Sequence, residues 1–406
     1  MATSEHEVIV VGAGAAGLAA GTYLRLAGRD VVVLEAEARV GGRLTTSVQG
    51  GWRLDRGFHV VLEGYPELRR LVPVRERQFP QLFAGVGMLE QGNLHVLADP
   101  RRVPATWRTS AATLVALVRG AIDPAALGRL VTRRGATVAD VEAVLPRALR
   151  NELVAPFLRG VLLAPDGDVP IRVAWQVLRG FLAGGVSLPP GGIATLAEVL
   201  AEPLAGLLRL EAPVEAVASG LVRLAGGEEL RAEEIIVAVG PETAARLLGS
   251  ERYAAARWRA QGYAHLATEE VVLELPLVAL PPASQPIWTV ATVSDVDPTR
   301  RPVDEDRSLV TVSFDPTLAP EDLRAALARV APALAGAEVL EVGVVEHALP
   351  VLERPAAIRP ARGITLAGDW TAAPSLDGAL SSGRRAAELV LLALGQRATG
   401  LGSKAA

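Results

Sequence analysis

Two short runs of branched apolar residues near the start of the chain have the pattern of buried parallel strands. They cover residues 8–11 and 31–34, and neither contains a polar side chain. Small and apolar residues recur between them at helical spacing, namely Gly17, Ala20, Leu24 and Ala27. The pattern predicts a strand, a helix and a second strand, the repeating unit of a doubly wound α/β sheet.

The hydrophobic pattern differs in the middle of the chain. Between residues 82 and 187 it is helical. One face comprises Leu114, Leu117, Val118 and Ala121, and another comprises Trp175, Leu178, Arg179 and Leu182. From residue 268 to 350 apolar and polar positions alternate, as in 271–275, 288–291 and 309–313, which predicts antiparallel strands. We therefore expect a helical segment followed by a second, antiparallel sheet.

A glycine-rich turn directly follows the first predicted strand. Gly12 permits a tight turn, Gly14 lets the backbone approach a pyrophosphate, and Gly17 lets the helix pack closely on the strand. Glu35 ends the second strand 23 positions after Gly12, the separation at which an acid reaches the ribose hydroxyls of a dinucleotide. These features together predict dinucleotide binding, and the alternative is a turn that has lost its ligand.

A second glycine turn stands just beyond Glu35. Gly41 and Gly42 would let the backbone pass close to a cofactor, and Arg43 would donate charge-assisted hydrogen bonds toward phosphates. Simple nicotinamide enzymes do not need this turn, so it favours FAD. The alternative interpretation is a surface turn without a ligand.

A further candidate site lies near the other end of the chain. Residues 364–367 predict a strand that leads into Gly368 and Asp369, and a helix follows from about Gly378. A carboxylate at a strand end can accept hydrogen bonds from a ribityl hydroxyl, and a helix N-terminus can direct backbone donors at the flavin pyrimidine edge. The alternative is that Asp369 only caps the helix.

Composition narrows the class of protein. The chain has 406 residues, more than one hydrophobic core usually organises, so we expect two structural units. Half of the residues are hydrophobic and the net charge is −4, which indicates a globular protein that does not bind nucleic acid. Cysteine is absent, so disulfides, thiolate metal sites and a cysteinyl flavin link are excluded, and the singly scattered histidines predict no metal site.

Membrane and export signals are also lacking. The polar residues 2–7 lead straight into the first strand without a charged segment and cleavage site, so we expect a cytoplasmic protein. The sequence contains no run of 18 uncharged apolar residues, so we expect no membrane-spanning helix. The apolar, arginine-bearing helix around Leu114 either packs on the body of the protein or touches a membrane surface peripherally.

These motifs, in this order, resemble the superfamily of flavin monoamine oxidases, protoporphyrinogen oxidases and phytoene desaturases. The turn at residues 189–193 resembles the one that returns the chain to the FAD-binding domain in desaturase-like members, and Val214 stands where the backbone meets the adenine. The resemblance implies noncovalent FAD held by Gly12, Gly14, Ala15, Ala16, Gly17, Glu35, Ala36, Gly41, Gly42, Arg43, Gly57, Phe58, Val214, Gly368, Asp369, Ser375, Leu376 and Ala379.

The resemblance also implies an α/β fold in which a Rossmann-type FAD-binding domain is interleaved with an α+β substrate domain. FAD-binding segments are expected at 1–85, 188–262 and 350–398. Substrate segments are expected at 86–187, which is helical, and at 263–349, which forms the antiparallel sheet, and 399–406 is a tail. The helices and the sheet would enclose a substrate cavity over the flavin.

The implied reaction is hydride transfer from a substrate C–H to flavin N5, with oxygen or a quinone as the second acceptor because no second nucleotide motif is present. Amine oxidases of this superfamily place a lysine near the flavin and a tyrosine in an aromatic cage. Here the only lysine is Lys404, and Ser375 stands at the tyrosine position. The Gly-Asp-Trp-Thr sequence from Gly368 resembles carotenoid and squalene-type desaturases. We therefore predict desaturation of a small apolar or amphipathic, isoprenoid-like substrate, with amine oxidation or a non-redox isomerase or cyclase as alternatives.

Two side chains are candidates for a catalytic role. His59 lies in the stretch that approaches the flavin ring in the family, where it would take a proton or contact substrate. The alternative is a histidine packed under the flavin or bonded to the backbone. Trp370 either lines the flavin or fills the core.

Overall fold

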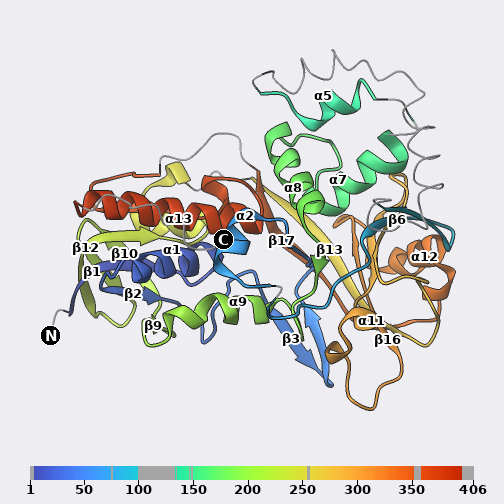
Figure 1. Cartoon of the computed structure of the whole chain (residues 1–406), viewed down its shortest axis with the longest axis horizontal. Coiled ribbons are helices and arrows are strands. Elements are labelled where there is room, and N and C mark those ends of the chain that lie inside the picture. Colours follow the sequence, from blue (N-terminus) through green and yellow to red (C-terminus); the bar gives the residue numbers. More distant parts are fainter. Residues whose placement is uncertain are drawn as a thin grey trace.

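The computed structural model describes residues 4–74, 76–98, 133, 135–145, 147, 150–253, 257–351 and 358–395. Figure 1 shows two sheets side by side, one beneath α1 and α13 and the other reaching α12, with α5, α7 and α8 above the second. This arrangement of helices on mixed sheets confirms the predicted α/β class.

The first sheet has seven strands drawn from three distant parts of the chain. Its order is β10-β11-β12-β1-β2-β9, and β18 also pairs with β12. The bounds are β1 Ser4–Val11, β2 Val31–Leu34, β9 Leu208–Arg209, β10 Val214–Ala218, β11 Leu221–Leu224, β12 Glu229–Val237 and β18 Ile364–Leu366. The pairs β1–β2, β1–β12 and β12–β18 are parallel, so the carboxyl ends of β1, β2 and β18 meet at one edge.

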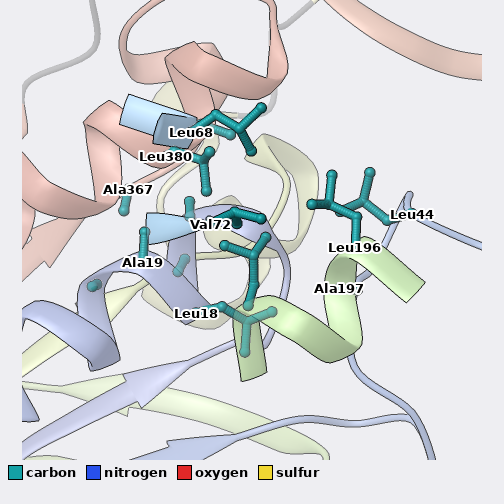
Figure 2. Packing of buried hydrophobic residues seen from close by; sticks show 14 of the residues in the cluster. Leu18, Ala19, Leu44, Leu68, Val72, Leu196, Ala197, Ala367 and Leu380 are labelled. Carbon is teal, nitrogen blue, oxygen red and sulfur yellow. The ribbon is translucent and has the colours of Figure 1, made fainter. Parts of the chain in front are cut away.

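Both faces of this sheet are covered because side chains of β1 alternate between two cores. Val8 and Val10 belong to the core beneath α1 (Ala15–Leu26), α9 (Ala194–Ala201) and α13 (Leu376–Ala393), whereas Ile9 and Val11 face α10 (Pro241–Leu248). Figure 2 shows Leu18 and Ala19 of α1 in the first core with Leu196 and Leu380 of the neighbouring helices. The uninterrupted apolar run of β1 follows from this burial on both faces.

The second sheet is built mainly from the predicted antiparallel region. Its order is β17-β13-β16-β15-β14-β6-β7, and all pairs are antiparallel except β14–β6. The bounds are β6 Gly85–Glu90, β7 Asn93–Ala98, β13 Arg257–Thr268, β14 Val278–Leu280, β15 Ile287–Thr292, β16 Ser308–Phe314 and β17 Glu338–Val351. Helix α12 (Pro320–Val330) packs its apolar residues Leu323 and Leu327 into the core of this sheet.

Shorter elements connect the two sheets. Two small two-stranded sheets lie in segments that connect them. One is the hairpin β3–β4 (Thr46–Gln49 and Trp52–Asp55), and the other pairs β5 (Val61–Leu62) with β8 (Val186–Ser187). The short helices are α2 (Pro66–Leu71), α5 (Val138–Glu142), a π-helical turn (Arg150–Val154), α7 (Ala155–Leu162), α8 (Ile171–Ala183) and α11 (Val293–Val296), with 3-10 turns at Glu202–Leu204, Glu251–Tyr253, Pro298–Arg300, Pro332–Leu334 and Asp369–Thr371. Among the described residues, no helix has the length and apolar character needed to cross a bilayer.

Three expectations for the middle of the chain need correction or qualification. Residues 85–98 form the hairpin β6–β7 rather than helix, because Gln91 and Gly92 take positive φ angles and reverse the chain. Residues 271–275 are not a strand: Val272 and Leu273 are buried as irregular chain, so their apolar pattern reflects burial rather than strand pairing. The face around Leu114 lies outside the described residues, and on α8 the predicted face has an exposed Trp175.

The division into segments can be compared with the strands. The first sheet takes strands from residues 4–34, 208–237 and 364–366, and the second from 85–98 and 257–351. The boundary between 262 and 263 falls within β13, and the one between 349 and 350 falls within β17. The interleaved domain division stays a prediction.

A buried ion pair joins the hairpin β3–β4 to the second sheet. Arg300 Nη1 donates to Asp55 Oδ2 at 2.7 Å, and Arg300 Nε to Asp297 Oδ2 at 3.2 Å, with all three side chains at most 4% exposed. Asp55 Oδ1 also accepts from Thr46 Oγ1 at 2.6 Å and from the amide of Ile193 at 2.9 Å. One carboxylate therefore ties together β3, β4, the turn before α9 and the connection from β15 to β16.

Replacing Arg300 by methionine would leave Asp55 and Asp297 buried without their cation. We expect the variant to lose about 3–5 kcal/mol of unfolding free energy, measured by urea denaturation. The matched control is Arg223→Met, because the pair of Arg223 with Glu215 is about half exposed on both sides and should contribute less than about 1 kcal/mol. Equal losses in the two variants would contradict the importance of the buried pair.

The same pair predicts a dependence of stability on pH. Burial acts to raise the pKa of Asp55, but the charge of Arg300 and the hydrogen bonds from Thr46 and Arg300 outweigh it, so the pKa is lowered. Because the pKa is lower in the folded than in the unfolded chain, Asp55 stabilises the fold above about pH 4 and loses this effect as pH falls through the folded value. Unfolding measured from about pH 7 downward should show a steeper acid loss in the wild type than in Arg300→Met. Parallel curves would contradict the assignment.

Candidate functional site

The first glycine turn connects β1 to α1 and leaves one of its glycines facing open space. A Cβ on Gly17 would lie 1.8 Å from the carbonyl oxygen of Gly12, so Gly17 is required for the close packing of helix on strand. A Cβ on Gly14 would meet nothing within 4 Å. Gly14 is also the N-cap of α1, whose first turn, starting at Ala15 and Ala16, has neither a side-chain cap nor an acidic residue. An uncapped helix start beside open space is suited to binding an anion.

The predicted acid lies at the same end of the sheet. Glu35 follows β2, and its Oε2 accepts a hydrogen bond from the amide of Ala13 at 2.7 Å. Its Oε1 accepts from the amide of Glu37 at 3.1 Å, on the far side of Ala36. The Glu35 carboxylate is thus held against the glycine turn, at the end of the sheet where the sequence predicts dinucleotide binding.

The second glycine turn packs directly against the first. The amide of Gly41 donates to the carbonyl oxygen of Ala13 at 2.8 Å, and Gly41 and Gly14 form an isolated parallel bridge. Gly41 and Gly42 have φ angles of +110° and +56°, which side-chain-bearing residues rarely adopt. A Cβ on Gly42 would lie 3.6 Å from the Cα of Gly14. Two glycine backbones therefore border the same space.

An ion pair joins this turn to the motif near the other end of the chain. Arg43 Nη2 donates to Asp369 Oδ1 at 2.7 Å, and the Asp369 side chain is only 4% exposed. Arg43 Nη1 donates to the carbonyl oxygen of Ala348 at 2.9 Å, and its guanidinium lies 5.6 Å from the ring centre of Trp258. The two predicted motifs are thus in contact, although 326 positions separate Arg43 from Asp369.

The remaining residues of the C-terminal motif have different surroundings. Ser375 is the N-cap of α13 and its hydroxyl accepts from the amide of Gly378 at 3.0 Å, so Ser375 rather than Asp369 caps the helix. Leu376 and Ala379 pack against the core beneath α1. Gly368 has a φ angle of +146° and begins the turn to Asp369.

Trp370 lies in the core rather than at a cavity. Its indole Nε1 donates to the carbonyl oxygen of Val239 at 3.0 Å, and its ring packs edge-on against Tyr253 with centroids 6.2 Å apart. Only 6% of the residue is exposed. Val214, predicted near the adenine, begins β10 at the edge of the first sheet, where the pairing with β11 is irregular.

A cavity of about 640 Å³ opens beside Gly42 and Arg43. Further walls come from the stretch after β4, from α7, from β13 and from β17. Its other lining residues are Thr45, Arg56, Phe58, His59, Gly160, Val161, Leu163, Gln261, Val344, Val345, Glu346, His347, Ala348 and Leu349. The volume suits a small organic ligand, and the cavity lies where the predicted helical segment and antiparallel sheet meet the cofactor turns.

The predicted stretch at Gly57 to His59 forms part of this wall. Gly57 has a φ angle of +104°, and the amide of Phe58 donates to Gln261 Oε1 at 3.3 Å. His59 Nε2 lies 3.0 Å from the carbonyl oxygen of Arg56, which is the backbone contact foreseen as the alternative. Desolvation lowers the pKa of His59 despite the charge of Asp55, so the imidazole is neutral at neutral pH.

Sequence reasoning missed the residues that β17 contributes to the cavity wall, and it missed Trp258, which lies behind His347 and is not itself a lining residue. The rings of Trp258 and His347 stack with centroids 5.0 Å apart, and Glu346 stands next to His347 on the cavity wall. Trp258 lies on β13 and His347 on β17, and they are 89 positions apart. No local motif marks them, because their proximity depends on strand pairing.

Comparisons with known proteins agree with this geometry. A relative named hydroxysqualene dehydroxylase, from Sinorhizobium fredii, is 27% identical over 442 aligned positions, covering 95% of this chain and 98% of the relative. Protoporphyrinogen oxidase 2 of Arabidopsis thaliana is 43% identical over 83 residues, but this match covers only 20% of the chain and 16% of that protein.

Solved structures and a family model extend the comparison. The crystal structure of an oxidoreductase from Methanosarcina mazei superposes with a TM-score of 0.71 at 18% identity, covering 93% of this chain and 99% of that one, which shows a shared fold. The family model described as flavin containing amine oxidoreductase matches residues 15–391, from the start of α1 into the last turn of α13. The chain therefore belongs to the flavin-containing amine oxidoreductase family and is an FAD-dependent oxidoreductase.

Proposed function

We propose that this enzyme oxidises a mainly apolar, isoprenoid-like substrate, held in the cavity of about 640 Å³ beside FAD. The single observation that carries the proposal is the position of this cavity. It is bordered by the glycine turn and Arg43 on one side and by apolar side chains of α7 and β17 on the other.

The described residues fit FAD. Open space at Gly14 and the uncapped start of α1 would receive the pyrophosphate, with Gly42 and Arg43 beside it. Glu35 would accept the ribose hydroxyls, and Asp369 a ribityl hydroxyl. The other predicted contacts are Gly12, Ala15, Ala16, Gly17, Ala36, Gly41, Gly57, Phe58, Val214, Gly368, Ser375, Leu376 and Ala379.

The pairing of Arg43 with Asp369 adds a function for both residues. A buried carboxylate near the cofactor would repel the phosphates and the reduced flavin, and Arg43 offsets that charge. The exposed part of the guanidinium, 45% of the side chain, remains available to a phosphate. Arg43 is thus proposed to hold Asp369 in an accepting orientation while contacting the cofactor.

Bound FAD supplies the chemistry, because it accepts a hydride from a substrate C–H. The chain's own residues orient the substrate and exclude water from it. Phe58, Val161 and Leu349 supply apolar walls, and the neutral His59 beside them is able to accept a proton. Oxygen or a quinone would then reoxidise the cofactor.

The polar part of the cavity wall refines the substrate class. Arg56, His59, Gln261 and Glu346 line the same cavity as the apolar residues. A ligand with an apolar body and one polar group, such as a hydroxyl, would satisfy both kinds of wall. The full-length match to a protein named hydroxysqualene dehydroxylase supports an isoprenoid substrate of this amphipathic kind.

Amine oxidation is the second candidate, and one observation favours it. Glu346 on the cavity wall would attract a substrate ammonium. Against it, the only lysine of the chain is Lys404 and Ser375 stands where the cage tyrosine is expected. We therefore rank the isoprenoid substrate first.

Filling the space beside Gly14 should weaken cofactor binding without unfolding the protein. We expect Gly14→Val to lose FAD affinity by about tenfold or more, because its side chain would occupy the proposed pyrophosphate position. Flavin fluorescence on titration into apoprotein measures the affinity, and circular dichroism checks the fold. Gly226→Val is the control, since that glycine also faces open space without a positive φ. Unchanged affinity in Gly14→Val would refute the proposed cofactor path.

Anaerobic mixing with candidate substrates tests the reaction. We expect the visible flavin absorbance to bleach with a hydroxylated squalene-type isoprenoid and to persist with benzylamine, because the cavity wall combines apolar with polar side chains and the amine-oxidase lysine is lacking. Bleaching by the amine alone would overturn the ranking.

Substitutions at two matched valines test whether the reaction takes place in this cavity. Val344 lines it, whereas Val342 on the same strand is equally exposed, at 43%, and does not. Val344→Asp should lower kcat/KM for the isoprenoid about tenfold, since a carboxylate would face an apolar substrate, and Val342→Asp should not.

A further inference from the structure

A second cavity, separate from the one beside the cofactor turns, has a buried carboxylate in its wall. Its volume is about 410 Å³. The lining residues are Glu63, Val74, Gln78, Phe79, Gln81, Leu82, Ala84, Ala183, Gly184 and Gly185, and none of them lines the first cavity. The Glu63 residue is only 6% exposed, so its side chain forms the floor of a pocket whose rim includes the exposed Gln78 and Gln81.

Glu63 is the least compensated of the buried carboxylates in the described part of the chain. The buried acids there are Asp55, Glu63, Glu67, Glu234, Asp297, Asp369 and Asp377. Five of them pair with an arginine, as Asp55 does with Arg300. Asp377 instead accepts from two amides and from Gln176.

The Glu63 carboxylate has a single hydrogen bond among the described residues. Gln81 Nε2 donates to Glu63 Oε1 at 3.1 Å. The neighbouring cation is Arg69, but its guanidinium donates to the backbone carbonyls of Glu63 and Ala183, both at 2.6 Å, rather than to the carboxylate. A buried carboxylate with one neutral donor is unfavourable unless a cation reaches it.

From this we infer that the Glu63 cavity is a binding site for a small organic cation carrying a primary ammonium group. The ammonium donates to the Glu63 carboxylate, and the side-chain oxygens of Gln78 and Gln81 are within the same wall to accept its other protons. Val74, Phe79 and Leu82 provide apolar contact for a short alkyl chain. This site is independent of the proposed substrate and of its cavity.

The first test uses n-butylammonium chloride with the FAD-loaded wild-type enzyme. We expect saturating n-butylammonium to raise the melting temperature by about 3–6 °C, because a ligand that binds only the folded state stabilises it. n-Butanol has the same alkyl chain without the charge, and it should give no shift, nor should sodium chloride at equal ionic strength. An equal response to n-butanol would mean an apolar cavity only and would overturn the proposal.

Two matched variants locate the binding. Glu63→Gln keeps the shape and removes the charge, and we expect it to weaken n-butylammonium binding at least tenfold by calorimetric titration. Glu346→Gln makes the same change on the wall of the first cavity and should leave the affinity unchanged. Loss of binding in Glu346→Gln with retention in Glu63→Gln would assign the amine to the first cavity and refute the proposal.

Stability without ligand gives a further readout. Glu63→Gln should melt at the same or a higher temperature than the wild type when no amine is present, because an uncompensated buried charge is removed. A lower melting temperature would show that the carboxylate is already satisfied and would contradict the inference. Ala84→Phe, at an exposed rim position, blocks the cavity without altering Glu63 and should also abolish the n-butylammonium shift.

Discussion

The Asp55 carboxylate is the buried charge on which the arrangement of the two sheets depends. It is desolvated, so it is stable only while Arg300, Thr46 and the amide of Ile193 all reach it. Those partners come from the connection between β15 and β16, from β3 and from the turn before α9. His265 on β13 adds a contact to the backbone carbonyl of Asp55 at 2.8 Å. Residues 56–59 follow Asp55 directly in the chain, and three of them line the cavity. The Asp55–Arg300 pair therefore fixes the position of one cavity wall.

A second charge pair, Arg43 with Asp369, fixes the position of the second glycine turn relative to the C-terminal motif. Arg43 and Asp369 come from opposite ends of the chain and meet at 2.7 Å where the carboxyl ends of the parallel strands converge. Since Asp369 is buried, loss of Arg43 would leave its charge uncompensated as well as removing a donor for phosphate. The same pair therefore joins the two motifs, and both residues belong to the proposed FAD site. Arg43 also contacts Ala348, which places β17 against the cofactor turn.

Local motifs made the glycine turns and their flanking strands predictable. Gly12 is recognisable by the positive φ of the turn and Gly17 by its packing against the Gly12 carbonyl, and the flanking strands are uniformly apolar because both of their faces are buried. The middle of the chain was harder to predict. The periodicity that suggested helix over 85–98 gave way to the turn at Gln91 and Gly92, and the alternation at 271–275 came from burial in an irregular segment. In the first place a local turn overrode the helical periodicity, and in the second tertiary packing accounts for the apolar pattern.

The sequence by itself determined the strand–glycine turn–helix unit, the acid at Glu35, the C-terminal strand and helix, and hence the kind of cofactor. These depend on contacts between residues close in the chain, where spacing alone carries the information. Only the tertiary structure decided which side chains share the cavity, that Arg43 pairs with Asp369, that Trp370 fills the core, and that the buried Glu63 pairs with no arginine in the part of the chain that the structure describes. The reason is physical: these features arise from strand pairing and desolvation across distant segments, and neither leaves a periodic trace in the sequence.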